Sequence, residues 1–253
     1  MKRIICISII SSLALAASPG ISPLSADPPL FVTLTWQGDT STTMTVNYHT
    51  DENARTSEVL YDTESREGGS GDYAYRAGGT IHQIEGLSDR LVHVVELTGL
   101  EPGKPYYFVA GDSQNGYTTE GKFRTISNDG SPVRFVSGGD MGIGDRVDRL
   151  LVQAAAQAPD FAMIGGDIAY VNGKVGDSGK WDIWLRSWAN LMVTPEGFMI
   201  PVALAVGNHE VRGGSLRGVW PGSPPPTQVF VSSPENARPW DSWRRTVPSP
   251  HRG

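Results

Sequence analysis

Cysteine is almost absent from this sequence, since Cys6 is the only one among 253 residues. One thiol cannot close a disulfide within the chain, so the fold must rely on its hydrophobic core rather than on cross-links. Dense basic runs are also absent, and the net charge is −6. Binding to nucleic acid needs a basic surface, and it is therefore not expected. The apolar fraction of 39% is typical of a globular protein.

A long apolar run is lacking as well. Lys2 and Arg3 precede an apolar stretch at 4–17, which is shorter than the roughly 20 residues that a membrane-spanning helix needs. A short basic region followed by such a stretch is typical of a secretory signal peptide. Small residues that suit cleavage follow at Ala16, Ala17 and Ala26. We therefore assign 1–26 as a signal peptide, with an uncleaved anchor as the alternative. A secreted or periplasmic protein with no stable membrane span after signal removal is predicted.

Residues 27–126 have the pattern of a β-sandwich. Met44, Val46 and Tyr48 alternate with polar residues, which is the period of a half-buried strand. Other β-prone runs precede and follow this one, separated by turn residues. The stretch 100–106, Leu-Glu-Pro-Gly-Lys-Pro-Tyr, resembles the tyrosine corner of fibronectin type III domains. The histidines of this region have no partner at ligand spacing, and we interpret them as strand or surface residues: His49, His82 and His93.

Beyond the turn-rich linker at 127–132, the pattern changes to alternating strands and helices. Apolar runs of strand length are followed by stretches with helical spacing. The predicted strands are 133–136, 161–164 and 199–206, and the predicted helices are 145–157 and 180–192. This alternation predicts a parallel βαβαβ sheet, as part of an α/β domain at 133–212.

Each of the three predicted strands runs into glycines and then into side chains that can bind a metal. These side chains are Asp140, Asp167, Tyr170, Asn208 and His209. Because the carboxyl ends of parallel strands meet at one edge of a sheet, we expect these residues to lie close together. Carboxylate, phenolate and amide oxygens suit a trivalent iron beside a divalent ion.

Three sequence blocks carry a family resemblance. Asp140-Met141-Gly142, Gly166-Asp167-Ile168-Ala169-Tyr170 and Gly207-Asn208-His209-Glu210 resemble the D-x-G, G-D-x-x-Y and G-N-H-E blocks of metallophosphoesterases. The tyrosine of the second block and the fibronectin-like domain before the blocks resemble the corresponding features of the purple acid phosphatases.

The resemblance implies a dinuclear centre of Fe(III) with a divalent ion, which is Zn, Fe or Mn. The resemblance also implies that Asp140 and Tyr170 would bind the ferric ion, that Asp167 would bridge both ions, and that Asn208 would bind the divalent ion. His209 would contact the phosphate of the substrate. The implied function is an acid phosphatase acting on small phosphate monoesters.

The family pattern continues with V-x-x-H and G-H-x-H blocks, which this sequence does not contain. His251 is the only histidine after His209, and eight of the 18 prolines fall within 213–253. We expect 213–253 to be disordered, either through a frameshift or as a natural divergent tail. The chain is then truncated and lacks the C-terminal histidine ligands. The alternative function is a non-catalytic exported binding protein with a relic metal site.

Three further expectations concern residues near the blocks. Asp145 is expected to be the N-cap of the helix that follows it. Trp181, Trp184 and Trp188 have the spacing of a core-facing helical stripe. Glu210 either tunes His209 through a hydrogen bond or is an ordinary loop acid.

Overall fold

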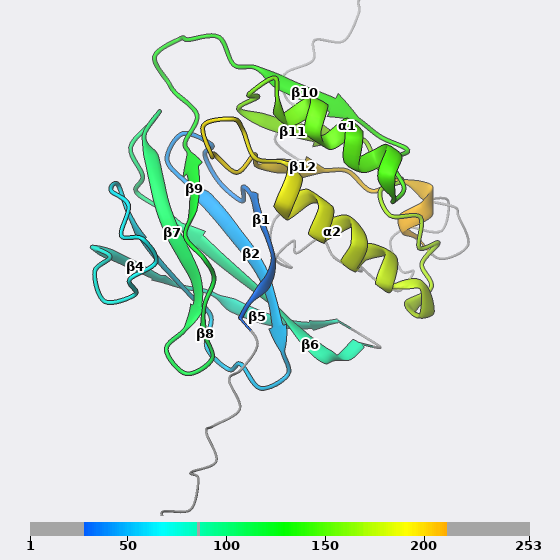
Figure 1. Ribbon diagram of the computed structural model, residues 1–253, viewed down its shortest axis with the longest axis horizontal. Helices are drawn as coiled ribbons and strands as arrows, with labels where there is room; N and C mark the ends of the chain where they lie inside the picture. The colour runs from blue at the N-terminus through cyan, green and yellow to red at the C-terminus, as the bar shows by residue number, and fades with distance from the viewer. Residues whose placement is uncertain (1–27, 85–86, 212–253) are drawn as a thin grey trace, which may run out of the picture.

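The computed structural model describes residues 28–84 and 87–211. The first part of the described chain forms two antiparallel sheets packed face to face, which we call the sandwich (Figure 1). One sheet has the order β1-β2-β6-β5 and the other β4-β3-β7-β8, with β9 paired to β7. The strands of the first sheet are β1 (Leu30–Thr35), β2 (Met44–Asp51), β5 (Thr80–Ile84) and β6 (Leu87–Leu97). Those of the second are β3 (Glu58–Asp62), β4 (Tyr75–Gly78), β7 (Pro105–Asp112), β8 (Gly116–Tyr117) and β9 (Gly121–Arg124).

The alternation on β2 is confirmed, but its prediction as a half-buried strand is wrong. Met44, Val46 and Tyr48 are fully buried in the core between the two sheets. Thr45 and His49, on the opposite face of the strand, are buried too. The reason lies outside the strand, because β2 is a central strand between β1 and β6, and the Phe31 ring of β1 contacts the His49 ring edge to face at 5.3 Å.

The predicted tyrosine corner is present. Tyr106 is buried, and its hydroxyl oxygen accepts a hydrogen bond of 2.9 Å from the backbone N–H of Glu101. A buried phenol needs such a partner, and the bond fixes the loop that leads into β7. This contact is the one that the spacing of the Leu-Pro-Tyr stretch predicts.

Two of the three sandwich histidines are buried. His49 on β2 is 7% exposed and His93 on β6 is fully buried. His93 stacks on Tyr48 and shares a hydrogen bond of 2.7 Å with the Thr50 hydroxyl. Burial lowers the pKa of His93 to about 4. Burial, together with the positive charge of Arg90, lowers the pKa of His49 to about 4.

The second part of the described chain, which we call the α/β part, is the predicted parallel sheet. Its strands pair in the order β10 (Phe135–Gly138), β11 (Phe161–Ile164) and β12 (Val202–Leu204). The connecting helices are α1 (Asp145–Ala155) and α2 (Gly179–Leu191), and two short 3-10 turns are η1 (Val175–Asp177) and η2 (Asn208–Glu210). The strand in the structure is shorter than the predicted one at 199–206. It starts later because the backbone N–H of Met199 donates to the Lys122 carbonyl of the sandwich rather than to β11.

Both helices pack in one hydrophobic core with the buried side chains of the sheet. The tryptophan stripe on α2 is confirmed, since Trp181, Trp184 and Trp188 are each at most 2% exposed. The N-cap prediction for Asp145 is wrong by one residue, because Gly144 precedes the helix and Asp145 is its first residue. Within the described residues, no helix combines the length and the apolar character needed to cross a bilayer.

The sandwich and the α/β part contact each other directly. Arg90 of β6 donates two hydrogen bonds to the carboxylate of Asp182 on α2, and the Trp36 ring meets the Phe161 ring edge to face at 5.9 Å. In Figure 1, β1 is the sandwich strand that lies beside α2. The two parts are therefore joined by a paired charge as well as by apolar contact.

The Arg90–Asp182 pair is expected to contribute measurably to stability. The side chains are 17% and 24% exposed. A bidentate ion pair that is partly buried is stronger than a pair on the surface. We expect Asp182→Asn to lower the free energy of unfolding in urea by about 1–2 kcal/mol. Asp177→Asn is the control, because the Asp177–Lys180 pair is more exposed and should cost less than about 0.5 kcal/mol. Equal losses in the two variants would contradict the expectation.

Candidate metal centre

The first two sequence blocks lie side by side at the carboxyl edge of the sheet. The loops that follow β10 and β11 continue the hydrogen bonding between the two strands. The backbone N–H of Asp140 donates to the Gly166 carbonyl at 3.1 Å, and that of Met141 donates to the Asp167 carbonyl at 2.9 Å. Asp140 and Asp167 are thereby held on neighbouring loops, as the motif spacing predicts.

Tyr170 completes this pair of loops. Its hydroxyl donates a hydrogen bond of 2.9 Å to Oδ1 of Asp140. The acceptor carboxylate stabilises the protonated phenol, and desolvation acts in the same direction, so the pKa of Tyr170 is raised. A carboxylate and a phenol that share one proton here are two oxygen donors at a distance suited to a common metal ion.

The third block, which includes η2, contacts the loop that carries the second block. The backbone N–H of His209 donates to Oδ1 of Asp167 at 2.8 Å, and its carbonyl accepts from the Asn172 N–H at 2.8 Å. The His209 ring centroid is 4.2 Å from that of Tyr170. Asn208, the residue before His209, is exposed. The structure thus places Asp167, Tyr170 and His209 in contact, with Asn208 adjacent in the chain.

Asn172 is a residue that the sequence reading missed. Its Oδ1 is hydrogen-bonded to Nδ1 of His209. Because an amide oxygen only accepts, Nδ1 carries the proton in this contact and Nε2 is left for another partner. The only signal in the sequence was a polar residue two positions after Tyr170, which is too common to be informative.

The backbone of these loops adopts left-handed conformations that side chains disfavour. The φ angles are 49° at Asp140, 54° at Asp167 and 56° at Tyr170. Such strain costs on the order of 1–3 kcal/mol per residue and gathers at functional sites. Gly166 has a φ of 99°, and a Cβ there would lie 2.5 Å from the backbone nitrogen of Gly207. Only glycine allows the second and third blocks to approach this closely.

Glu210 has neither of the roles that the sequence left open. Its carboxylate accepts hydrogen bonds from the backbone N–H groups of Asp167, Ile168 and Gly207, each at 2.7 Å. The side chain is buried, and its partners are in the backbone rather than in the His209 ring. It therefore connects the loop after β11 to the loop after β12.

The oxygen donors at this edge fit a hard metal ion. Across residues 28–84 and 87–211, no group of three His, Cys, Asp or Glu side chains is placed to hold a metal. The carboxylates of Asp140 and Asp167 would therefore need the Tyr170 phenol and the Asn208 amide to complete a ligand set. These donor types suit Fe(III) or a divalent ion rather than a soft metal.

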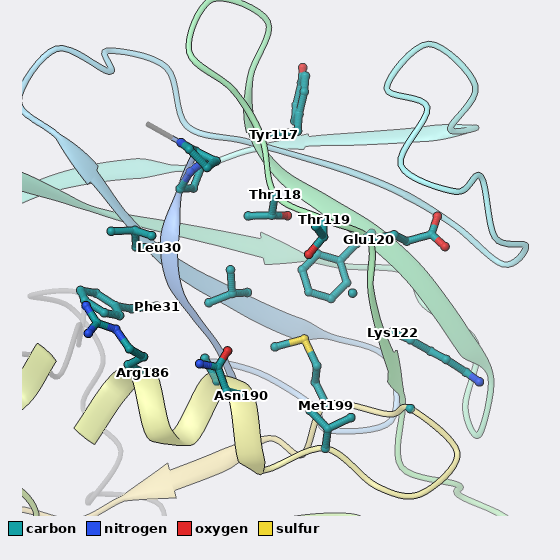
Figure 2. Close-up of a pocket in the computed structure, with 18 residues that line it drawn as sticks. Leu30, Phe31, Tyr117, Thr118, Thr119, Glu120, Lys122, Arg186, Asn190 and Met199 are labelled. Atoms are coloured by element: carbon teal, nitrogen blue, oxygen red, sulfur yellow. The ribbon is translucent and has the colours of Figure 1, made fainter. Parts of the chain in front are cut away.

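A separate groove lies between the sandwich and the α/β part. It has a volume of about 650 Å³ and is lined by the start of β1, the β8–β9 turn and α2 (Figure 2). Among its described lining residues, none of the five predicted site residues occurs. A second groove, of about 490 Å³, contains Asp140 and continues between β10, α1 and α2. Only the second groove adjoins the candidate centre.

Two known protein families match this chain. Residues 29–125 match the purple acid phosphatase N-terminal domain, and residues 79–251 match the calcineurin-like phosphoesterase family. The second match covers more than half of the chain.

Known proteins give the same assignment. Purple acid phosphatase 23 of Arabidopsis thaliana is 26% identical over 195 residues, covering 64% of this chain and 41% of that protein. Acid phosphatase type 7 of Mus musculus is 31% identical over 215 residues, covering 79% of this chain and 45% of that protein. The chain thus spans less than half the length of these relatives.

A solved structure supports the fold. The purple acid phosphatase PPD1 from yellow lupin (Lupinus luteus) seeds superposes with a TM-score of 0.58 at 20% identity, covering 78% of this chain and 37% of that one. The sandwich lies within the match to the N-terminal domain, and the parallel sheet lies within the match to the phosphoesterase family. The chain belongs to the purple acid phosphatase family of calcineurin-like phosphoesterases.

Proposed function

We propose that the candidate centre serves the hydrolysis of small phosphate monoesters at acidic pH, with Asp140, Asp167, Tyr170 and Asn208 as ligands of two metal ions. The ions would be Fe(III) and a divalent Zn, Fe or Mn. The observation that carries this proposal is the hydrogen bond of 2.9 Å between the Tyr170 hydroxyl and Asp140, beside the loop that holds Asp167. Two bound ions would neutralise the phosphoryl charge and activate water for attack on phosphorus.

The protein's own contribution would be to orient the phosphate. Asn172 holds the His209 ring through Nδ1, and the ring lies against Tyr170. Nε2 of His209 is then the nitrogen available to a phosphate oxygen or to the leaving group. Because both neighbours restrain the ring, little rotational freedom would be lost when the substrate binds.

A second candidate function has its own support. The sequence has a single histidine after His209, and the described residues include no three-ligand group of His, Cys, Asp or Glu. A non-catalytic exported binding protein with a relic metal site would have these features. Secretion, with 1–26 as the signal peptide, belongs to both proposals. The expectations for 1–26 and for 213–253 lie outside the described residues.

Hydrolysis of 4-nitrophenyl phosphate by the 253-residue chain distinguishes the two functions. We expect turnover to be slow, at least about 100-fold below that of a complete site, because each missing ligand weakens metal binding. That slow turnover should require added iron and zinc and should disappear in Asp167→Ala. Asp145→Ala is the matched control, since Asp145 is an exposed acid at the start of α1.

Each outcome decides between the proposals. Metal binding without turnover would favour the relic site. Fast turnover that Asp167→Ala abolishes would show that other residues complete the ligand set. Absence of both metal binding and turnover would refute the metal centre itself.

A further inference from the structure

Glu210 is a buried carboxylate that binds backbone amides and, within residues 28–84 and 87–211, no cationic side chain. It is 8% exposed and is the last residue of η2. Oε2 accepts from the N–H groups of Asp167 and Gly207, and Oε1 accepts from the N–H of Ile168, all at 2.7 Å. Hydrogen bonds to an ionised acceptor are short and roughly twice as strong as neutral ones. Three of them offset the cost of burying the charge.

The three donors belong to two different loops. Asp167 and Ile168 follow β11, whereas Gly207 lies between β12 and η2. The same loops also meet where the His209 N–H donates to Asp167 and where Gly166 approaches Gly207. Glu210 is thus a side chain whose hydrogen bonds connect the loop of Asp167 to the segment carrying Asn208 and His209.

We propose that Glu210 is a positioning residue of the metal centre, which holds Asp167 and Asn208 at a fixed separation without binding the metal. This inference rests on the proposed function for the identity of the ligands, but the hydrogen bonds do not depend on it. Glu210 acts through the backbone, so its effect on metal affinity passes through the placement of the two loops.

A carboxylate is required because all three partners are donors. Glutamine has nearly the same shape but only one acceptor oxygen, and its NH₂ group would face an N–H group. Glu210→Gln therefore breaks at least one of the three bonds while filling the same space. A role in packing alone would not distinguish glutamate from glutamine, so this substitution separates positioning from packing.

The test uses the full 253-residue chain labelled with ¹⁵N. In the wild type, we expect the amides of Asp167, Ile168 and Gly207 to be shifted downfield and protected from hydrogen exchange, although they lie in loops. In Glu210→Gln, these resonances should move upfield and exchange faster. Affinity for Co²⁺, followed by visible absorption, should fall about 10–100-fold. Glu196→Gln is the control, because Glu196 is an exposed acid of the same part.

The outcomes separate this inference from the proposed function. Unchanged amide resonances and unchanged Co²⁺ affinity in Glu210→Gln would refute the positioning role. Rapid exchange at all three amides of the wild type would refute it too, even if the variant does not fold. If the wild type binds no Co²⁺ while the three amides respond as expected, the metal centre fails and the connection between the loops stands.

Discussion

Replacing Trp184 by alanine is expected to lower the free energy of unfolding of the α/β part by about 3–5 kcal/mol. Trp184 is 1% exposed, its ring stacks on Trp188 at 5.0 Å, and it meets Trp181 edge to face at 6.0 Å. Removing the indole leaves a large cavity between α2 and the sheet, which a three-stranded sheet with one exposed face cannot fill. Phe135 and Met163, on that face, are 53% and 44% exposed.

Urea denaturation followed by tryptophan fluorescence measures this loss. Ile183→Ala is the matched control, because Ile183 lies on the same helix and is 45% exposed. It should cost less than about 1 kcal/mol. Similar midpoints for Trp184→Ala and Ile183→Ala would show that the tryptophan stripe does not form the core of this part.

Acidification from pH 7 to pH 4 is expected to destabilise the sandwich through its two buried histidines. The pKa of His49 and that of His93 are about 4 in the folded protein, against 6.5 for an exposed imidazole. Between these values the unfolded chain binds the proton and the folded chain does not, so stability falls as the pH falls. Above pH 6.5 the effect is absent, and below pH 4 it is complete at about 3 kcal/mol for each histidine.

His93→Phe tests this expectation. Phenylalanine keeps a ring against Tyr48 but cannot titrate, so the slope of unfolding free energy against pH should be smaller between pH 4 and pH 6.5. His82→Phe is the control, because His82 lies on exposed β5 and should leave the slope unchanged. Carboxylates with lowered pKa that do not interact with His93, such as Asp62 and Glu120, are present in every variant and cancel in the comparison. An identical slope in His93→Phe and the wild type would contradict the assignment.

Much of the architecture follows from local patterns in the sequence. The spacing of Trp181, Trp184 and Trp188 places them on one face of a helix of 3.6 residues per turn, whatever the helix packs against. Tyr106 is placed by a short loop of fixed length, so its bond to Glu101 was predictable. The three blocks were found because each follows an apolar run, and parallel strands bring their carboxyl ends to one edge.

Other features depend on segments far away in the chain. The burial of the outer face of β2 depends on side chains of other elements, such as Phe31, whose ring contacts His49, so the alternating pattern could not reveal it. The late start of β12 depends on Lys122 in the sandwich, whose carbonyl accepts the hydrogen bond from the Met199 N–H. In the same way, the bond between Asn172 and His209 joins residues of two loops that meet only after the sheet has formed.

The sequence by itself determined the alternation of strands and helices in the α/β part, the order of the two parts and the residue types at the candidate centre. These depend on periodicity and on short motifs, which are properties of neighbouring residues. Only the tertiary structure decided how Asp167, Asn172, His209 and Glu210 connect the loops. Their hydrogen bonds span 37 to 43 positions in the chain, and a contact over such a separation exists only when packing has fixed both ends.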